Sequence, residues 1–225
     1  MNCELDQQMI FKLLAIILLG YFLGAIPFGL IIGRLTRGID VREYGSGKTG
    51  FANVLRAAGA GAGALTFAAD VGKGILTAWL GGIIVGESTA MVGPLTFDFQ
   101  AAQVLAAMAA VAGHNWSVFI RFEGGRGVDT SLGGMIAMSP FVGLACLATG
   151  IIVIVVWRYV SLGSMSGAGS SILILIPLVS LGHQPVEYLI YGAIATALVI
   201  YQHRDNIGRL RTGTERRLGR KGEQR

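Results

Sequence analysis

The sequence predicts an all-α integral membrane protein of about seven transmembrane or partly inserted helices, with the N-terminus outside and the C-terminus in the cytoplasm. Hydrophobic residues make up 53% of the chain and charged residues only 14%, whereas soluble domains usually carry about 25% charged residues. Several apolar stretches approach or exceed the roughly 20 residues that span a bilayer as a helix. Lys and Arg gather in three polar segments, which the positive-inside rule places together in the cytoplasm.

Apolar and polar stretches alternate along what we predict to be a single polytopic membrane domain, residues 1–225. The apolar membrane segments cover residues 9–33, 57–85, 101–120, 131–157, 162–181 and 186–202, and a basic tail occupies residues 203–225. The link at residues 87–98 contains no Lys or Arg, so we expect it outside the cell.

The number of crossings after residue 126 decides where the basic tail lies. Three single spans would leave the tail outside, so an even number of crossings is required. We therefore expect residues 131–157 to be broken near Pro140 into two shorter helices, since proline removes a helix hydrogen bond. The alternative is five spans with one apolar segment lying flat, so the helix count is between five and seven.

Small residues are frequent, with 34 Gly in 225 positions. In a membrane bundle, Gly and Ala allow helix backbones to approach closely, and residues 57–64 and 101–112 fit this interpretation. The two cysteines, Cys3 and Cys146, form no disulfide framework or metal-ligand spacing. We predict no metal, no cofactor and no nucleic-acid partner, and the oligomeric state is open.

The first polar segment carries Gly-Ser-Gly-Lys-Thr-Gly-Phe-Ala-Asn-Val-Leu-Arg at residues 45–56. Glycines let backbone amides converge on an anion, and a following helix N-terminus suits a phosphate. The candidate ligands are glycine amides, a hydroxyl and two cations: Gly45, Ser46, Gly47, Lys48, Gly50 and Arg56. The segment is not a nucleotide-binding P-loop, because the required earlier glycine is absent. The alternative is a flexible, positive-inside loop.

The second polar segment has the same character. Gly124, Gly125 and Gly127 surround Arg126 immediately before another apolar segment, which predicts a second anion site. The alternative is a tight turn with a positive-inside arginine. His114 lies near the end of the preceding apolar segment and is either a site residue or an interfacial hydrogen-bonding group.

The third polar segment directly follows the last apolar segment. His203, Asp205 and Asn206 offer a proton acceptor and orienting groups near the interface, and the alternative is a basic tail attracted to anionic lipid. Asp70 and Lys73 lie inside an apolar stretch at i, i+3 spacing, where they can pair with each other or contact a substrate.

Together these segments resemble the acyl-phosphate-dependent glycerol-3-phosphate acyltransferases of bacteria over nearly the whole chain. The family's first motif reads approximately Gly-Ser-Gly-Asn-x-Gly-Ala-Thr-Asn-x-x-Arg and is matched at residues 45–56. Its second, Gly-Gly-Lys-Gly-Val-Ala-Thr, is matched at residues 124–130. Its third, His-Arg-Asp-Asn-Ile followed by Gly-Thr-Glu, is intact at residues 203–207 and 213–215.

The resemblance implies a multi-pass enzyme of the bacterial cytoplasmic membrane, with its active site facing the cytoplasm. It would transfer an acyl chain from acyl phosphate to the 1-hydroxyl of glycerol 3-phosphate, giving lysophosphatidic acid for phospholipid synthesis; membrane lipids surround it. The implied catalytic residues are His203, Asn206 and Ser46. The implied phosphate-binding residues come from the first two motifs: Gly45, Ser46, Gly47, Lys48, Gly50, Asn53, Arg56, Gly124, Gly125, Arg126, Gly127 and Thr130. The supporting candidates are ionisable: Asp70, Lys73, His114, Asp205 and Glu215.

Five residues depart from the family motifs. Lys48 replaces Asn, Phe51 and Ala52 replace an Ala-Thr pair, Arg126 replaces Lys, and Asp129 replaces Ala. Because Arg and Lys are not interchangeable at a shaped phosphate site, a different phosphorylated polyol as acyl acceptor is a second hypothesis.

A third hypothesis is a transporter or binding protein for an anionic solute. Intramembrane ionisable residues and a broken helix also mark transport sites, and Asp70, Lys73 and Pro140 provide them here. The clustering of the polar segments on one side argues against it, because a transport path needs groups that face both sides.

Overall fold

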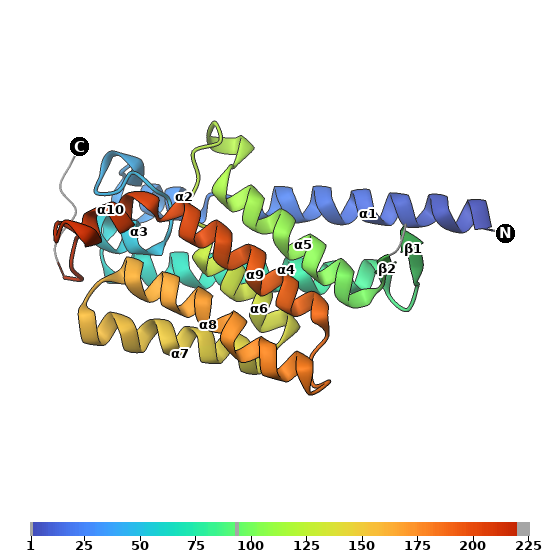
Figure 1. The fold of residues 1–225 in the computed structure, drawn as a ribbon. Helices are drawn as coiled ribbons and strands as arrows, with labels where there is room; N and C mark the ends of the chain where they lie inside the picture. Colours follow the sequence, from blue (N-terminus) through green and yellow to red (C-terminus); the bar gives the residue numbers. More distant parts are fainter. Residues whose placement is uncertain (1, 93–94, 220–225) are drawn as a thin grey trace.

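The computed structural model describes residues 2–92 and 95–219, and these form an elongated helix bundle (Figure 1). Residues 220–225 of the predicted basic tail lie outside this part. The helices are α1 (Asn2–Ala25), α2 (Phe28–Arg37), α3 (Phe51–Ala58), α4 (Ala60–Val85), α5 (Phe99–Asn115), α6 (Val128–Met138), α7 (Pro140–Trp157), α8 (Val160–Ser180), α9 (Val186–Gln202) and α10 (Arg204–Arg211). Short 3-10 turns occur at Val41–Glu43 and Val118–Ile120.

The only sheet in the described part is a small hairpin between α4 and α5. Its strands, β1 (Ala90–Val92) and β2 (Leu95–Phe97), pair antiparallel. Among the residues that the structure describes, five helical segments are long and apolar enough to cross a membrane: Gln7–Arg37, Ala60–Val85, Phe99–Ile120, Pro140–Trp157 and Val160–Ser180. The shorter helix α9 is also apolar, so the fold is an all-α integral membrane bundle.

The first apolar segment, predicted as one helix over residues 9–33, differs from the prediction. Helix α1 ends at Ala25 and α2 begins at Phe28, because Pro27 has no N–H to continue the hydrogen-bond ladder. The ammonium of Lys73 donates a 3.0 Å hydrogen bond to the carbonyl of Ile26, so this carbonyl is satisfied away from water. Apolar length alone gave no sign of this break.

Two further breaks shape the bundle. Helices α6 and α7 meet at Ser139, immediately before Pro140, which occupies the first position of α7. A proline is tolerated there because that N–H has no intrahelical partner. Between α3 and α4, Gly59 has a φ of 95°, a conformation that side chains with a Cβ rarely adopt.

Helix α5 lies at the centre of the bundle and packs against α1, α4 and α9. Ala102, Ala106, Ala107 and Ala110 are all buried on it. A Cβ added at Gly24 of α1 would overlap the backbone of Ala110. Small residues on both helices therefore allow the backbone contact that stabilises helix pairs in lipid.

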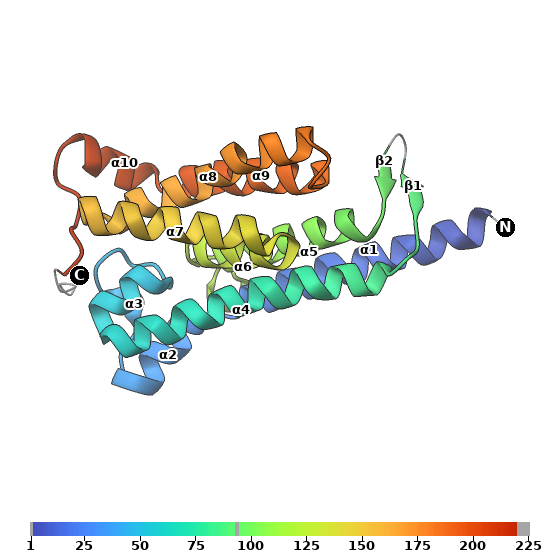
Figure 2. The same cartoon turned by 90° about the horizontal axis from the view of Figure 1, so that it is seen from below.

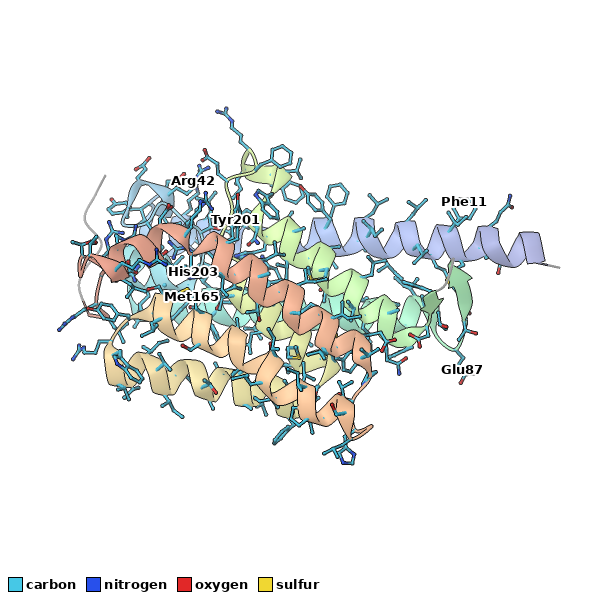
Figure 3. All side chains as sticks on the ribbon, in the orientation of Figure 1. Phe11, Arg42, Glu87, Met165, Tyr201 and His203 are labelled. Atoms are coloured by element: carbon cyan, nitrogen blue, oxygen red, sulfur yellow. The ribbon has the colours of Figure 1, made fainter. Side chains whose placement is uncertain are left out.

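The three polar segments lie at one end of the molecule. Helices α2, α3 and α10 gather there, and the N-terminus and the β1–β2 hairpin lie at the other end (Figures 1 and 2). Figure 3 shows His203 and Arg42 at the first end and Glu87 and Phe11 near the second. The fold thus brings polar residues that are distant in sequence to one end.

The close approach of α1 and α5 gives a stability prediction. Gly24→Ala should destabilise the protein by about 1–3 kcal/mol, because overpacking forces helices apart. Thermal unfolding of the detergent-solubilised protein measures this loss. Gly72→Ala is the matched control, since a Cβ at Gly72 meets no atom within 4 Å and alanine favours a helix. Equal melting temperatures for the two variants would contradict the packing argument.

Candidate active site

A polar pocket of about 60 Å³ lies at the end of the bundle where the three polar segments meet. Its walls come from these segments and from the first turn of α8. The lining residues are Ser46, Lys48, Gly50, Phe51, Ala52, Asn53, Arg56, His114, Arg126, Gly127, Val128, Asp129, Val160, Ser161, Ser164, His203, Asn206 and Glu215.

Asn53 fixes the shape of the first loop. Its Oδ1 accepts a 2.9 Å hydrogen bond from the amide of Ser46, and its Nδ2 donates to the carbonyls of Val41 and Lys48 at 2.7 and 2.9 Å. Because Asn53 is the third residue of α3 and is buried, the loop is held against the helix start. The side chains of Ser46 and Lys48 then line the pocket.

We expected the backbone amides of the first loop to bind an anion, but two of them donate hydrogen bonds to other protein groups. The amide of Ser46 donates to Asn53 and the amide of Gly47 donates to the carbonyl of Tyr44, so neither is free for an anion. Gly45 and Gly47 have φ values of 55° and 69° and serve the turn rather than the pocket wall. The cationic side chains of Lys48 and Arg56 line this side of the pocket.

In the second loop, too, two glycine amides donate hydrogen bonds to backbone carbonyls. The amide of Gly125 donates to the carbonyl of His114 at 3.0 Å, and that of Gly124 to Asn115 at 3.2 Å. A Cβ at Gly125 would overlap the His114 ring. These two glycines allow the loop to pack on the end of α5, and this packing brings Arg126 and Gly127 to the pocket wall.

An ion pair inside the bundle supports that packing. Lys73 Nζ lies 2.8 Å from Asp70 Oδ1, and His114 Nδ1 lies 3.6 Å from the same oxygen. All three side chains are buried. Only His114 lines the pocket, so Asp70 and Lys73 act from behind it.

His203 follows α9 and presents one ring nitrogen to the pocket. Its Nδ1 lies 2.8 Å from the carbonyl of Val199; since a carbonyl only accepts, Nδ1 carries the proton and Nε2 is left as an acceptor. Burial, together with the nearby charge of Arg126, lowers the pKa of His203 to about 4. The ring is therefore neutral at physiological pH.

Glu215 connects the elements around His203. Its carboxylate accepts hydrogen bonds from Ser161 Oγ at 2.8 Å, Asn206 Nδ2 at 2.6 Å and Arg209 Nε at 2.7 Å. Burial alone raises the pKa of this carboxyl, but the three donors outweigh burial and lower the pKa. Asn206 is thereby oriented, and its buried Oδ1 has no partner among the described residues.

Three cations in the pocket have no anionic partner. Within residues 2–92 and 95–219, no ion pair forms at Lys48, Arg56 or Arg126. Burial is the main cause that lowers the pKa of each, to about 10 for Arg126, and neighbouring arginines lower it further. An anion would relieve both effects, so the pocket is suited to phosphate.

Several predicted site residues lie outside the pocket. Thr130 is fully buried against α4, and Asp205 is exposed. The predicted residues that do not line the pocket are Gly45, Gly47, Asp70, Lys73, Gly124, Gly125, Thr130 and Asp205. Within the described residues, no group of three or more His, Cys, Asp or Glu side chains is arranged to hold a metal ion.

Sequence reasoning missed the contribution of α8. Ser161 and Ser164 line the pocket, and they lie at i, i+3 in the first turn of α8. Two serines on one face at the start of an apolar helix were the available signal. Asp129, noted only as a departure from a motif, also lines the pocket, and its carboxyl accepts a hydrogen bond from the amide of Phe51.

A larger apolar groove of about 520 Å³ adjoins the pocket. Its walls come from α3, α4, α6, α7, α8 and α9. Both cavities share a boundary made of Phe51, Val128, Asp129, Val160 and Ser164. A ligand with a charged head and an apolar tail can therefore occupy both at once.

Known proteins resemble this chain over nearly its whole length. A family model described as glycerol-3-phosphate acyltransferase matches residues 14–213. Glycerol-3-phosphate acyltransferase 3 of Dehalococcoides mccartyi (strain 195) is 42% identical over 217 residues, covering 95% of this chain and 99% of the relative. The glycerol-3-phosphate acyltransferase of Clostridioides difficile (strain 630) is 42% identical over 214 residues, with the same coverage.

Solved structures give the same result. The glycerol 3-phosphate form of PlsY, an integral membrane glycerol 3-phosphate acyltransferase, superposes with a TM-score of 0.78 at 37% identity, covering 92% of this chain and 96% of that one. Its lysophosphatidic acid form superposes with a TM-score of 0.77 at 37% identity, covering 92% and 95%.

The pKa of His203 predicts an acid-sensitive site. The pKa of His203 in the folded protein, about 4, lies below the ordinary 6.5, so the unfolded chain takes up this proton first as the pH falls. The contribution of His203 to the free energy of unfolding is therefore complete above pH 6.5 and is lost as the pH falls toward 4. Between pH 6.5 and about pH 5 the loss should be about 2 kcal/mol. Chemical unfolding in detergent across this range measures it.

His203→Asn provides the comparison, because asparagine cannot titrate. The ordinary pKa of Glu215 is 4.5 and is lowered further in the fold, so Glu215 titrates below the chosen range. From pH 5 to 6.5 the stability of the variant should change by about 2 kcal/mol less than that of the unmutated protein, because the contribution of His203 is gone. A slope equal to that of the unmutated protein would show that His203 is not the responsible group.

Proposed function

The chain belongs to the glycerol-3-phosphate acyltransferase family, and from this premise we propose that it transfers an acyl chain from acyl phosphate to the 1-hydroxyl of glycerol 3-phosphate, giving lysophosphatidic acid. The observation that carries the proposal is the junction of a cationic pocket with an apolar groove. Acyl phosphate has a charged head and an apolar tail, and glycerol 3-phosphate is wholly polar. The two cavities match this pair of substrates.

The cations hold the phosphates. Arg56 of the first motif and Arg126 of the second motif both line the pocket. Their guanidinium groups can bind phosphate oxygens in a bidentate manner. Lys48 adds a third positive charge, and the Ser46 hydroxyl adds a hydrogen-bond donor. The acyl chain extends from this pocket past Phe51 and Val128 into the groove.

The reaction requires positioning more than covalent chemistry. Acyl phosphate is a mixed anhydride, so its carbonyl is already activated and phosphate is the leaving group. The acceptor hydroxyl oxygen forms the new ester bond, the bond from carbonyl carbon to phosphate oxygen breaks, and the hydroxyl proton passes to the donor's phosphate. The protein holds the reacting groups together and stabilises the developing negative charge.

His203 and Asn206 orient the polar substrate. The Nε2 of His203 and the Oδ1 of Asn206 are acceptors at the pocket wall, which suits the hydroxyl groups of glycerol 3-phosphate. Glu215 keeps Asn206 in place through its 2.6 Å hydrogen bond.

We place the pocket on the cytoplasmic side of the bacterial cytoplasmic membrane. The basic segments share one end of the bundle (Figure 1), which the positive-inside rule assigns to the cytoplasm. Seven membrane helices, α1 and α4–α9, with α6 and α7 dipping in and returning at Ser139, give an external N-terminus and a cytoplasmic C-terminus.

The assay uses purified protein in detergent with palmitoyl phosphate and glycerol 3-phosphate, and it measures lysophosphatidic acid. Arg56→Ala and Asn206→Ala should each lower kcat/KM about 100-fold. The first variant loses a cation that pairs with a substrate phosphate, and the second loses an acceptor for a substrate hydroxyl group. Arg211→Ala is the control, since Arg211 is exposed and does not line the pocket. Full activity in a folded Arg56→Ala variant would reject the phosphate assignment.

A further inference from the structure

After the third motif the chain continues along the connection between α7 and α8. Residues 216–219, the C-terminal strap, follow Glu215 and the turn at Gly213, which has a φ of 70°. The family match ends at residue 213, so the strap lies beyond it. Figure 2 shows the chain passing from α10 across the end of α7 toward α3.

Specific contacts hold the strap on the α7–α8 connection. The amide of Leu218 donates a 2.6 Å hydrogen bond to the carbonyl of Arg158, and Arg158 Nη2 donates at 3.3 Å to the carbonyl of Leu218. Arg217 donates to the Tyr159 hydroxyl at 3.3 Å and lies over its ring. The strap's partners, Arg158 and Tyr159, directly precede Val160, which borders both cavities.

The strap leads from one cavity to the other. It begins directly after Glu215, which lines the polar pocket, and its Leu218 lines the apolar groove. Between them, the exposed Arg216 lies close enough to Arg56 for its charge to be the next largest cause, after burial, that lowers the pKa of Arg56. Arg216 forms no ion pair with any residue in the described part.

We propose that the strap is a binding element for the acyl donor, in which Leu218 packs on the first methylenes of the chain and Arg216 attracts the donor's phosphate beside Arg56. This inference rests on the proposed acyl transfer. Glycerol 3-phosphate has no apolar part that could use Leu218. Of the two substrates, only the donor joins a phosphate to an apolar chain and can therefore contact the strap while it occupies both cavities.

The kinetic test compares two truncations of the full chain. Ending the chain after Glu215 removes the strap, whereas ending it after Gly219 keeps the strap and removes only residues 220–225. The first should raise the KM for palmitoyl phosphate more than tenfold and leave the KM for glycerol 3-phosphate within about twofold. The second should behave like the unmutated chain. Unchanged donor KM after removal of the strap would overturn the proposal.

Single substitutions separate the two contacts. Leu218→Ala should raise the donor KM about tenfold at any salt concentration, because lost apolar burial is not screened. Arg216→Ala should raise it about fivefold at low salt and much less in 1 M salt, because exposed charges are screened. Equal changes in the KM values of both substrates would indicate a merely structural strap and contradict the proposal. Melting temperatures confirm that each variant is folded.

A binding test independent of turnover uses Leu218→Cys in a Cys3→Ser, Cys146→Ser background. Hexadecyl phosphate, which cannot transfer an acyl group, should slow maleimide labelling at position 218, and glycerol 3-phosphate should not. If hexadecyl phosphate leaves the rate of maleimide labelling at position 218 unchanged, the strap proposal is overturned, even in an active enzyme. Protection in a chain that makes no lysophosphatidic acid supports the strap and rejects the proposed acyl transfer instead.

Discussion

The buried ion pair of Lys73 and Asp70 is the interaction on which the arrangement of the pocket depends. Lys73 also satisfies the carbonyl of Ile26 where α1 breaks, and Asp70 faces the His114 ring. The second loop packs on that ring and on the His114 carbonyl. An unpaired charge in this interior would be strongly unfavourable, so the pair ties α1, α4 and α5 together behind the pocket.

The pocket combines satisfied and unsatisfied polar groups in a consistent way. Asn53 and Glu215 each make three hydrogen bonds that fix the protein framework. Arg56 and Arg126 instead form no ion pair with any described residue, and burial and repulsion from neighbouring arginines lower their pKa values. Such preorganised positive charge is what stabilises a departing phosphate without rearrangement of the protein.

Glycine has a different use here from the one its pattern suggests. Gly124 and Gly125 approach the backbone and ring of residues 114–115, and Gly24 approaches Ala110. In both places the absence of a Cβ allows close packing. The amides of Gly124 and Gly125 are already bonded to carbonyls, so the glycines shape the anion site while the arginines supply its charge.

The sequence by itself determined the membrane class and the segments that meet at the pocket, because hydropathy and basic clusters are read locally along the chain. It also singled out Arg56, Arg126, His203 and Asn206, all of which line one pocket. Only the tertiary structure decided which amides are free, that Ser161 joins the wall, and that an apolar groove adjoins it. The groove, for example, joins Phe51 of the first polar segment to Leu218 near the end of the described chain, and no local pattern encodes which distant segments meet.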